Sequence, residues 1–372
     1  MGCLGILRQP VLIPMEKSMK IKQLISFLLL LACVIAAATV LSGCEREKNK
    51  YVSYSLDYFD TVTTITGYEY NKEEFDEISD MILGLLGEYH RLYTIYHSYT
   101  GIENLYSINS LTDGEHRVVK VDSRIIDMLT YAKAMYDLTD GKMNIAMGSV
   151  LSIWHNYRNV GMNNPASATL PPMEKLLAAA EHTDINNLII DNEASTVFIS
   201  DPEMTLDVGA VAKGYAVEMI ARELEQMGIT GYVLNVGGNV RTIGTKPNGD
   251  KWIAGIENPD TTSDEGYIRY LLLDGETIVT SGSYQRFYMV DGVSYHHIVD
   301  SDTLMPAEGY LSVSVVCKNS AHADSLSTAL FCMELEAGRA LVESLDGVEV
   351  LWVLSDGSTV ETSGFGAYVT QI

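Results

Sequence analysis

The sequence predicts an α+β fold in which a largely antiparallel sheet forms the core of a single body with packed helices. Two observations carry this prediction. Helix-type periodicity is concentrated before residue 188, and strand-type segments follow it without a steady β–α–β alternation. The composition, 47% hydrophobic and 20% charged over 372 residues, is that of a globular chain able to bury a large core.

The N-terminal segment has the layout of a secretory signal. A basic run at residues 17–22 precedes an apolar run from Leu24 to Val40, and small residues lead into Cys44. Leu41–Cys44 resembles the lipobox of bacterial lipoproteins, whose cysteine is lipidated. A transmembrane anchor is the alternative, but the apolar run is short for a span. We therefore expect a lipoprotein signal peptide over residues 1–43, with Met15 or Met19 as alternative starts. Lipidated Cys44 then begins the mature chain, acylated with groups such as palmitate, and a membrane tether covers residues 44–56. The main domain, residues 57–372, then lies on the extracytoplasmic face of the cell membrane.

The charge excludes one class of partner. The chain carries a net charge of −24, and the leader, with four basic residues and one acidic residue, leaves −27 for the rest. Such a surface disfavours nucleic acid and is repelled by anionic lipid, so membrane attachment must come from acyl chains. Beyond the leader and Cys44 only Cys317 and Cys332 remain, and both lie in apolar stretches that predict buried thiols, paired or unpaired.

The first half of the chain alternates helices with loops. Apolar spacing predicts a helix over Glu73–Tyr93, and a segment rich in Tyr, Ser and Asn predicts a loop over Tyr93–Asn109. Asp122 is placed to cap a helix that runs to about Leu138 and ends at Thr139–Gly141. Pro172 opens a helix that runs through Ala180.

Strand-type segments dominate elsewhere. They share β-branched or aromatic residues between turn signals, and they are Asp60–Gly67, Leu188–Asp191, Thr196–Ser200, Tyr232–Val236, Val240–Gly244, Trp252–Glu257, Tyr267–Leu273, Thr277–Thr280, Phe287–Val290, Tyr295–Val299, Leu311–Cys317 and Val348–Leu354. A helix from about Ala323 to Ser344 interrupts them.

The stretch LDVGAVAKGYAVE, Leu206–Glu218, predicts a strand, a turn and a helix. We expect a short strand over Met204–Leu206 and a helix that buries four apolar residues and ends near Gly228: Val217, Ile220, Ala221 and Leu224. Lys213 falls in the first turn, where a cation is unfavourable unless something negative faces it. The bare backbone N–H groups at a helix start suit an anion. A solvated lysine is the alternative.

Three further segments carry candidate chemistry. Gly237–Asn239 predicts a tight hairpin turn that also permits a close ligand. His296 and His297 point to opposite faces of a strand, so one is expected to be buried and the other exposed. Asp324 and Thr328 share a helix face, and a carboxylate with a hydroxyl suits Mg²⁺; the alternative is that Asp324 only complements its own helix N-terminus.

Taken in order, these segments resemble the ApbE family of flavin transferases, which are bacterial lipoproteins. The likeness covers nearly the whole mature chain and rests on eight motifs: Phe59–Thr61, the Tyr99 loop, Gly141–Trp154, Leu206–Glu218, Val233–Asn239, Thr280–Phe287, His296–Asp300 and His322–Leu330. It implies an ApbE/T-fold-like single catalytic body. It also implies Mg²⁺-dependent transfer of FMN from FAD to a threonine hydroxyl of an acceptor flavoprotein, such as a subunit of a redox-driven ion pump, with release of AMP.

The resemblance also assigns roles by position. Asp207 and Lys213 would contact FAD, and the Ala210 carbonyl, Asp324 and Thr328 would hold Mg²⁺. The residues implied to line the flavin or adenine pocket are Phe59, Tyr99, Lys142, Met143, Asn144 and Ile298. His297 would sit at the reacting phosphate as the base, oriented by Asp300, while Asp324 would contribute to catalysis through the metal.

The chain departs from the family pattern at two places. Lys142-Met143-Asn144 stands where the family often has Ala-Phe-Asp, and residues 301–304 read Ser-Asp-Thr-Leu in place of Pro-Arg-Thr-Gly. Two alternatives share the same site: an FAD pyrophosphatase that uses water as acceptor, and a flavin-binding lipoprotein without turnover.

Overall fold

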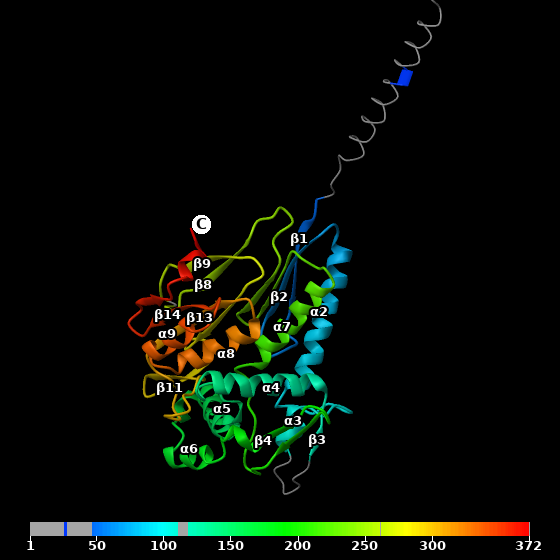
Figure 1. Cartoon of the computed structure of the whole chain (residues 1–372). Coiled ribbons are helices and arrows are strands. Elements are labelled where there is room, and N and C mark those ends of the chain that lie inside the picture. Colours follow the sequence, from blue (N-terminus) through cyan, green and yellow to red (C-terminus); the bar gives the residue numbers. More distant parts are fainter. Residues whose placement is uncertain (1–25, 28–46, 111–117, 261, 372) are drawn as a thin grey trace, which may run out of the picture. The chain divides into compact units, whose positions relative to one another are not determined.

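A computed structural model of the chain describes residues 26–27, 47–110, 118–260 and 262–371 (Figure 1). The chain divides by its contacts into Met1–Lys48 and a compact unit, Asn49–Ile372. Cys44 and nearly all of the predicted signal peptide lie outside the described residues. None of the helices in these ranges combines the length and apolar character needed to cross a bilayer.

An eight-stranded sheet forms the centre of the compact unit. Its strand order is β1-β2-β6-β7-β10-β13-β14-β15, and every neighbouring pair is antiparallel. The strands are β1 (Asn49–Ser55), β2 (Thr63–Glu69), β6 (Tyr232–Val236), β7 (Asn239–Ile243), β10 (Thr277–Gly282), β13 (Tyr310–Cys317), β14 (Glu349–Leu354) and β15 (Thr359–Glu361). The predicted α+β class with a largely antiparallel sheet is confirmed.

Side-chain alternation along the central strands explains the layers. Val315 of β13 and Trp352 of β14 belong to the large core that the helices share, whereas Val316 and Leu351 belong to a second core on the opposite face. Helices α2 (Lys72–Tyr93), α7 (Ala212–Gln226) and α8 (Ser320–Phe331) pack side by side over the first face (Figure 1). A three-stranded sheet contributes to the second core; its strands are β8 (Trp252–Glu257), β9 (Tyr267–Leu273) and β16 (Val369–Thr370).

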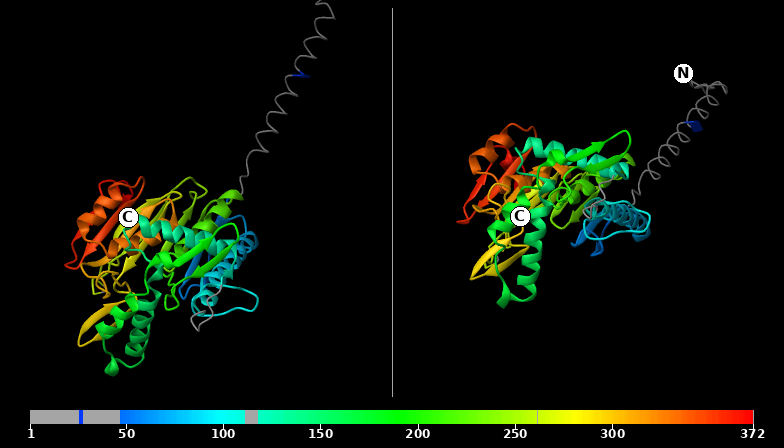
Figure 2. Two further views of the ribbon diagram at one scale, coloured as in Figure 1. Left: turned by 60° about the horizontal axis from the view of Figure 1, so that its bottom comes forward. Right: turned by 90° about the horizontal axis from the view of Figure 1, so that it is seen from below.

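The remaining elements lie beyond the ends of these helices. One group contains α3 (Leu105–Asn109), α4 (Ser123–Leu138) and a small sheet made of β3 (Val119–Lys120), β5 (Thr196–Ile199) and β4 (Leu188–Asp191). The other group contains α5 (Gly148–Asn163), α6 (Met173–Ala180) and a hairpin made of β11 (Phe287–Val290) and β12 (Val293–His296). Figure 2 shows the hairpin, in yellow, beside these helices. Helix α9 (Leu335–Glu343) follows α8.

Several helix predictions are confirmed in detail. The four apolar residues predicted to line the buried face of α7 are completely buried, and Gly228 has the left-handed φ of 75° that ends the helix. Asp122 caps α4 by accepting a hydrogen bond from the Arg124 N–H. Both Cys317 and Cys332 are buried free thiols.

Four local predictions were wrong. Residues 49–55 form β1 and do not belong to a tether. Tyr51, Ser53 and Ser55 alternate with more exposed residues, and the strand pairs with β2 although charged residues precede it. Met204–Leu206 is not a strand, since the Asn109 side chain satisfies both backbone groups of Leu206. The helix expected over residues 323–344 breaks at residues 332–334 into α8 and α9, and α3 lies in the expected loop.

Candidate active site

Asp324 lies where α8 meets the first turn of α7. Its Oδ1 accepts a hydrogen bond from the Lys213 ammonium at 2.7 Å, and its Oδ2 accepts one from the Gly214 N–H at 2.7 Å. The α7 N-cap residue, Val211, offers no capping side chain, so Asp324 supplies the cap from another helix. The negative partner that a first-turn lysine requires is therefore a buried carboxylate of the chain itself, 5% exposed.

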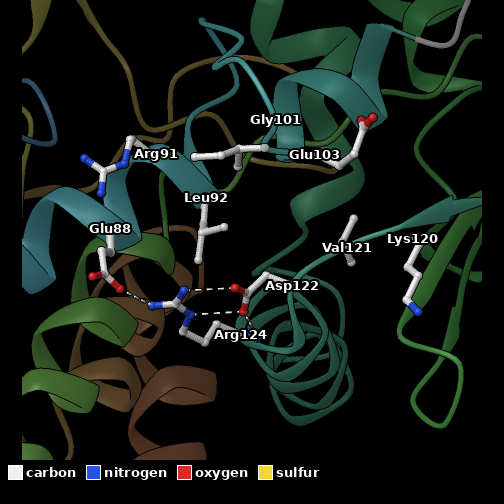
Figure 3. Close-up of a pocket in the computed structure, with 10 residues that line it drawn as sticks. Glu88, Arg91, Leu92, Gly101, Glu103, Lys120, Val121, Asp122 and Arg124 are labelled. Carbon is white, nitrogen blue, oxygen red and sulfur yellow. Dashed lines mark hydrogen bonds and ion pairs between the residues drawn. The ribbon is translucent and has the colours of Figure 1, made fainter.

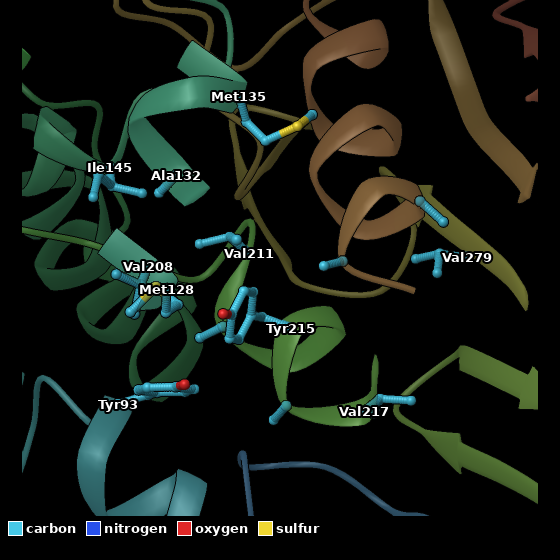
Figure 4. Close-up of a cluster of buried hydrophobic side chains, with 14 of the residues drawn as sticks. Tyr93, Met128, Ala132, Met135, Ile145, Val208, Val211, Tyr215, Val217 and Val279 are labelled. Atoms are coloured by element: carbon cyan, nitrogen blue, oxygen red, sulfur yellow. The ribbon is translucent and has the colours of Figure 1, made fainter. Parts of the chain in front are cut away.

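The start of α7 is firmly anchored. Val211 and Tyr215 pack among apolar side chains of α4, including Met128 and Met135, as Figure 4 shows. Tyr215 also makes an edge contact with Tyr93 of α2, with ring centroids 6.4 Å apart. This packing fixes the position of the backbone N–H groups at the helix start.

Gly214 permits the close approach of the two helices. A Cβ atom at this position would lie 2.3 Å from Asp324 Cβ and 2.5 Å from the Ser320 carbonyl oxygen. Both contacts involve atoms that cannot rotate away, so any larger residue must separate α7 from α8. The sequence motif contained this glycine, but the prediction gave it no role.

The oxygen atoms around Asp324 fit a hard cation. In an α-helix the Gly214 N–H would donate to the Ala210 carbonyl, but Asp324 takes that donor. Within the described residues no hydrogen bond ends on the Ala210 carbonyl oxygen. The Thr328 hydroxyl lies one turn after Asp324 and 3.4 Å from both the Asp324 carbonyl and the Ser281 hydroxyl. The three predicted metal ligands are thus all oxygen donors, as Mg²⁺ prefers.

The same site does not suit a cation bound by protein atoms alone. The described residues hold no group of three or more His, Cys, Asp or Glu that could bind a metal. Asp324 is moreover already paired with the Lys213 ammonium. A divalent cation beside an ammonium needs more negative charge than one carboxylate provides. Mg²⁺ sites of this kind are completed by substrate phosphates.

The two adjacent histidines have different environments. His296 is buried, and both ring nitrogens are used: Nε2 donates to the Ala307 carbonyl at 2.8 Å, while Nδ1 accepts from the Ile298 N–H at 3.2 Å. His297 is half-buried, and its enclosed Nδ1 has no partner among the described residues. Burial, followed by the positive charges of Arg286 and Arg158, lowers the pKa of His297 to about 3. His297 is therefore neutral at pH 7, and it is the histidine with a free ring nitrogen.

Asp300 does not orient His297 as predicted. Its Oδ1 accepts from the Lys142 ammonium at 2.8 Å and from the Asp302 N–H, because the chain turns back at residues 300–305. Lys142 also pairs with Asp302 Oδ2 at 2.8 Å. The two segments that differ from the family pattern, residues 142–144 and 301–304, therefore contact each other through Lys142 and Asp302. The Lys142 ammonium is directed at two carboxylates, which raise its pKa against the effect of burial.

Three of the other predicted pocket residues, Phe59, Met143 and Ile298, belong to the large hydrophobic core or pack against it. Met143 and Ile298 are buried, at 1% and 5% exposure. Asn144 caps the following turn by accepting from the Ala146 N–H, and Phe59 adopts a left-handed φ of 56° while its N–H donates to His90 Nδ1. Tyr99 forms an isolated bridge with Ile102. Among the described residues no hydrogen bond joins Phe59, Tyr99 or Asn144 to the Asp324 side chain.

Asp207 lies at a second charged cluster that the sequence prediction missed. Its Oδ1 accepts from the Gly209 N–H at 2.9 Å, and its Oδ2 lies 3.9 Å from His155 Nε2 on α5. Burial lowers the pKa of His155, while Asp207 raises it. Arg158 and Arg286 act on the same histidine. The available signal was the helical spacing of His155 and Arg158.

A separate pocket of about 500 Å³ lies between α2, residues 101–103 and the start of α4 (Figure 3). Arg124 bridges Glu88 at 2.7 Å and Asp122 at 2.9 Å there. None of the predicted site residues lines this pocket.

Comparisons with known proteins agree with the resemblance. The family model described as "ApbE family" matches residues 59–352. An FAD:protein FMN transferase of Klebsiella pneumoniae is 26% identical over 316 residues, covering 85% of this chain and 93% of that protein. An FAD:protein FMN transferase of Treponema pallidum is 30% identical over 261 residues, covering 66% of this chain and 70% of that protein.

Solved structures agree in fold. The crystal structure of the ApbE protein from Thermotoga maritima has a TM-score of 0.73 at 27% identity and covers 87% of this chain and 100% of that chain. The flavin transferase ApbE from Vibrio cholerae has a TM-score of 0.71 at 24% identity, with coverages of 86% and 99%, which supports the fold alone.

Proposed function

The chain belongs to the ApbE family, and on that premise we propose that it is an FAD:protein FMN transferase. In the proposed reaction a threonine hydroxyl of an acceptor flavoprotein attacks the FMN phosphorus of FAD. A threonine O–P bond forms, the pyrophosphate P–O bond breaks, and AMP leaves with the electron pair.

The observation that carries the proposal is the Asp324 cluster. Oxygen ligands beside the Lys213 ammonium come from Asp324, from Thr328 and from the Ala210 carbonyl, which accepts no hydrogen bond among the described residues. This set of groups lacks the negative charge that a bound pyrophosphate would bring. Mg²⁺ bound there would neutralise the pyrophosphate charge that develops during transfer. Lys213 has three N–H donors, so it can hold Asp324 and a phosphate oxygen together.

We propose that His297 acts as the general base and accepts the proton of the attacking threonine hydroxyl. Its imidazole is neutral at pH 7 and therefore free to accept a proton. A phosphate anion bound nearby opposes the lowering of its pKa and moves the group toward the range useful for catalysis. His296 does not suit this role, because both of its nitrogens are occupied.

Measuring AMP release from FAD tests the proposal. The full chain is incubated with FAD and Mg²⁺, with and without an acceptor flavoprotein subunit. We expect AMP to form when Mg²⁺ and the acceptor are both present, and Asp324→Ala to abolish it. Release without the acceptor would indicate a pyrophosphatase, and FAD binding without any AMP would indicate a flavin-binding protein.

We further propose that the mature protein is anchored through acyl chains on Cys44, on the extracytoplasmic face of the membrane. The lipobox-like run Leu41–Cys44 after an apolar segment supports this. Cys44→Ala should release the protein from membranes or leave it unprocessed. Detection of a peptide from upstream of Cys44 in the mature protein would refute the anchor.

A further inference from the structure

Arg286 and His297 lie opposite each other at the open end of the β11–β12 hairpin. The last ladder pair joins Phe287 to His296, so the next position outward on each strand is Arg286 and His297. Residues opposite each other in an antiparallel pair lie close together. The Arg286 backbone raises the pKa of His297 against the effect of burial, which agrees with this placement.

Helix α5 brings a second arginine to the same end of the hairpin. The helix packs tightly on the strands: a Cβ atom at Gly161 would lie 2.5 Å from Tyr288, and Trp154 stacks on Tyr295 with centroids 6.4 Å apart. His155 and Arg158 are three residues apart and share a helix face. Because His155 approaches Asp207 to 3.9 Å, this face is directed at the loop that carries Asp207.

The two guanidinium groups lack an anionic partner. Among the described residues no carboxylate lies within 4.0 Å of either Arg158 or Arg286, and the Arg286 side chain donates one hydrogen bond, to the Asp60 carbonyl at 3.2 Å. In a chain of net charge −24 this contrasts with arginines that do pair with carboxylates. Those arginines are Arg124, Arg222, Arg241, Arg269 and Arg339.

The surroundings of the pair also favour an anion. Burial and then the charge of Arg286 lower the pKa of Arg158, and burial followed by the charges of both arginines lowers the pKa of His155 and of His297. Arg158 is half-buried and Arg286 is exposed, and like charges beside a half-buried group are unfavourable unless an anion joins them. Asp207, the carboxylate that acts on Arg158, does not form an ion pair with it among the described residues.

We propose that Arg158 and Arg286 form a guanidinium pair that binds a phosphate of FAD on the side of the site formed by Asp207 and His297. The inference rests on the proposed function, because it takes FAD as the substrate. Guanidinium groups bind phosphate through paired N–H donors. The pair complements the Asp324 cluster: the pyrophosphate has two phosphates, and positive charge beside a phosphate stabilises the negative charge on its oxygens during transfer.

Comparing the binding of FAD with that of riboflavin, which has no phosphate, tests whether the two arginines bind a phosphate. The full chain in detergent with Mg²⁺ is titrated with each flavin as wild type, Arg158→Met and Arg286→Met. Arg339→Met, a surface arginine of α9, serves as the matched control. We expect each site variant to bind FAD about 10- to 100-fold more weakly, the scale of charged hydrogen bonds, with riboflavin affinity unchanged. We also expect the melting temperatures of the two site variants to equal that of the wild type, and Arg339→Met to bind FAD with wild-type affinity.

Other outcomes overturn the inference in recognisable ways. Wild-type affinity for FAD in both variants refutes it. If FAD binding persists but transfer requires a higher acceptor concentration, the arginines bind a carboxylate of the acceptor instead. Equal losses for FAD and riboflavin would mean a merely structural role. If the wild type itself binds no FAD, the proposed function fails before the arginine pair is tested.

Discussion

Replacing Gly214 with alanine tests the contact between α7 and α8 on which the proposed site depends. The added Cβ would lie 2.3 Å from Asp324 Cβ, 2.5 Å from the Ser320 carbonyl oxygen and 3.0 Å from Asn239 Nδ2. At the first two distances the helices must move apart, which also lengthens the two 2.7 Å hydrogen bonds that Asp324 accepts.

The expected magnitude follows from opposing effects. Alanine is favoured over glycine inside a helix by about 1 kcal/mol. Overpacking costs about 1–3 kcal/mol, and weakening hydrogen bonds to a charged group costs about 1.5–3 kcal/mol more. We therefore expect Gly214→Ala to lower the free energy of unfolding by about 1.5–5 kcal/mol and to lose most Mg²⁺-dependent AMP release.

Urea denaturation with a matched glycine provides the assay. Gly84 lies on the exposed face of α2 with nothing within 4 Å of its added Cβ, so Gly84→Ala should leave stability equal or raise it by up to about 1 kcal/mol. If Gly214→Ala proves as stable and as active as Gly84→Ala, α7 and α8 do not meet as described and the cluster is wrong.

Four further predictions follow from individual side chains. Lys213→Ala should weaken FAD binding by roughly 1–3 kcal/mol in a fluorescence titration, because a charged hydrogen bond is lost; unchanged affinity would place Lys213 outside the site. His297→Ala should slow transfer by ~10²–10⁴-fold at saturating FAD and acceptor, and His296→Ala much less; equal, small losses would exclude both as the base. The folded pKa of His297, about 3, lies below its ordinary 6.5, so the folded chain binds fewer protons and its stability falls as the pH drops through that interval. His297→Gln should flatten this decline in urea midpoints measured from pH 7 to 4, and an unaltered slope would contradict the burial of the ring. Glu218 is 3% exposed and accepts from Arg222, Arg241 and the Ser320 N–H, so Glu218→Ala should cost about 3–5 kcal/mol of stability, against less than about 1 kcal/mol for the exposed Glu343→Ala. A similar loss of stability in the two glutamate variants would show that the buried hydrogen bonds of Glu218 do not stabilise the fold.

Local rules predicted the α7 region well, because its signals are short-range. The apolar spacing from Val217 to Leu224 and the position of Gly228 define the buried face and the end of the helix. The unfavourable position of Lys213 correctly required a negative partner. That the partner is Asp324, 111 residues away in sequence, depends on how α7 and α8 pack, and no local pattern specifies this.

The errors have the same physical origin. Asp300 follows His297 by three residues, yet Lys142, 158 residues distant in the chain, takes its carboxylate. The charged start of β1 concealed a strand whose pairing with β2 supplies its stability. His155, Arg158 and Arg286 escaped prediction, because the packing of α5 on the β11–β12 hairpin, rather than a motif, brings them together.

Mapping the product on the acceptor tests the central claim most directly. After incubation of the full chain with FAD, Mg²⁺ and an acceptor flavoprotein subunit, peptide mass spectrometry locates any added flavin, and AMP is quantified in the same sample. The account predicts one FMN, joined through its phosphate to a threonine with loss of water, for each AMP released, and neither product with Asp324→Ala. Equal amounts of free FMN and AMP with an unmodified acceptor would contradict it.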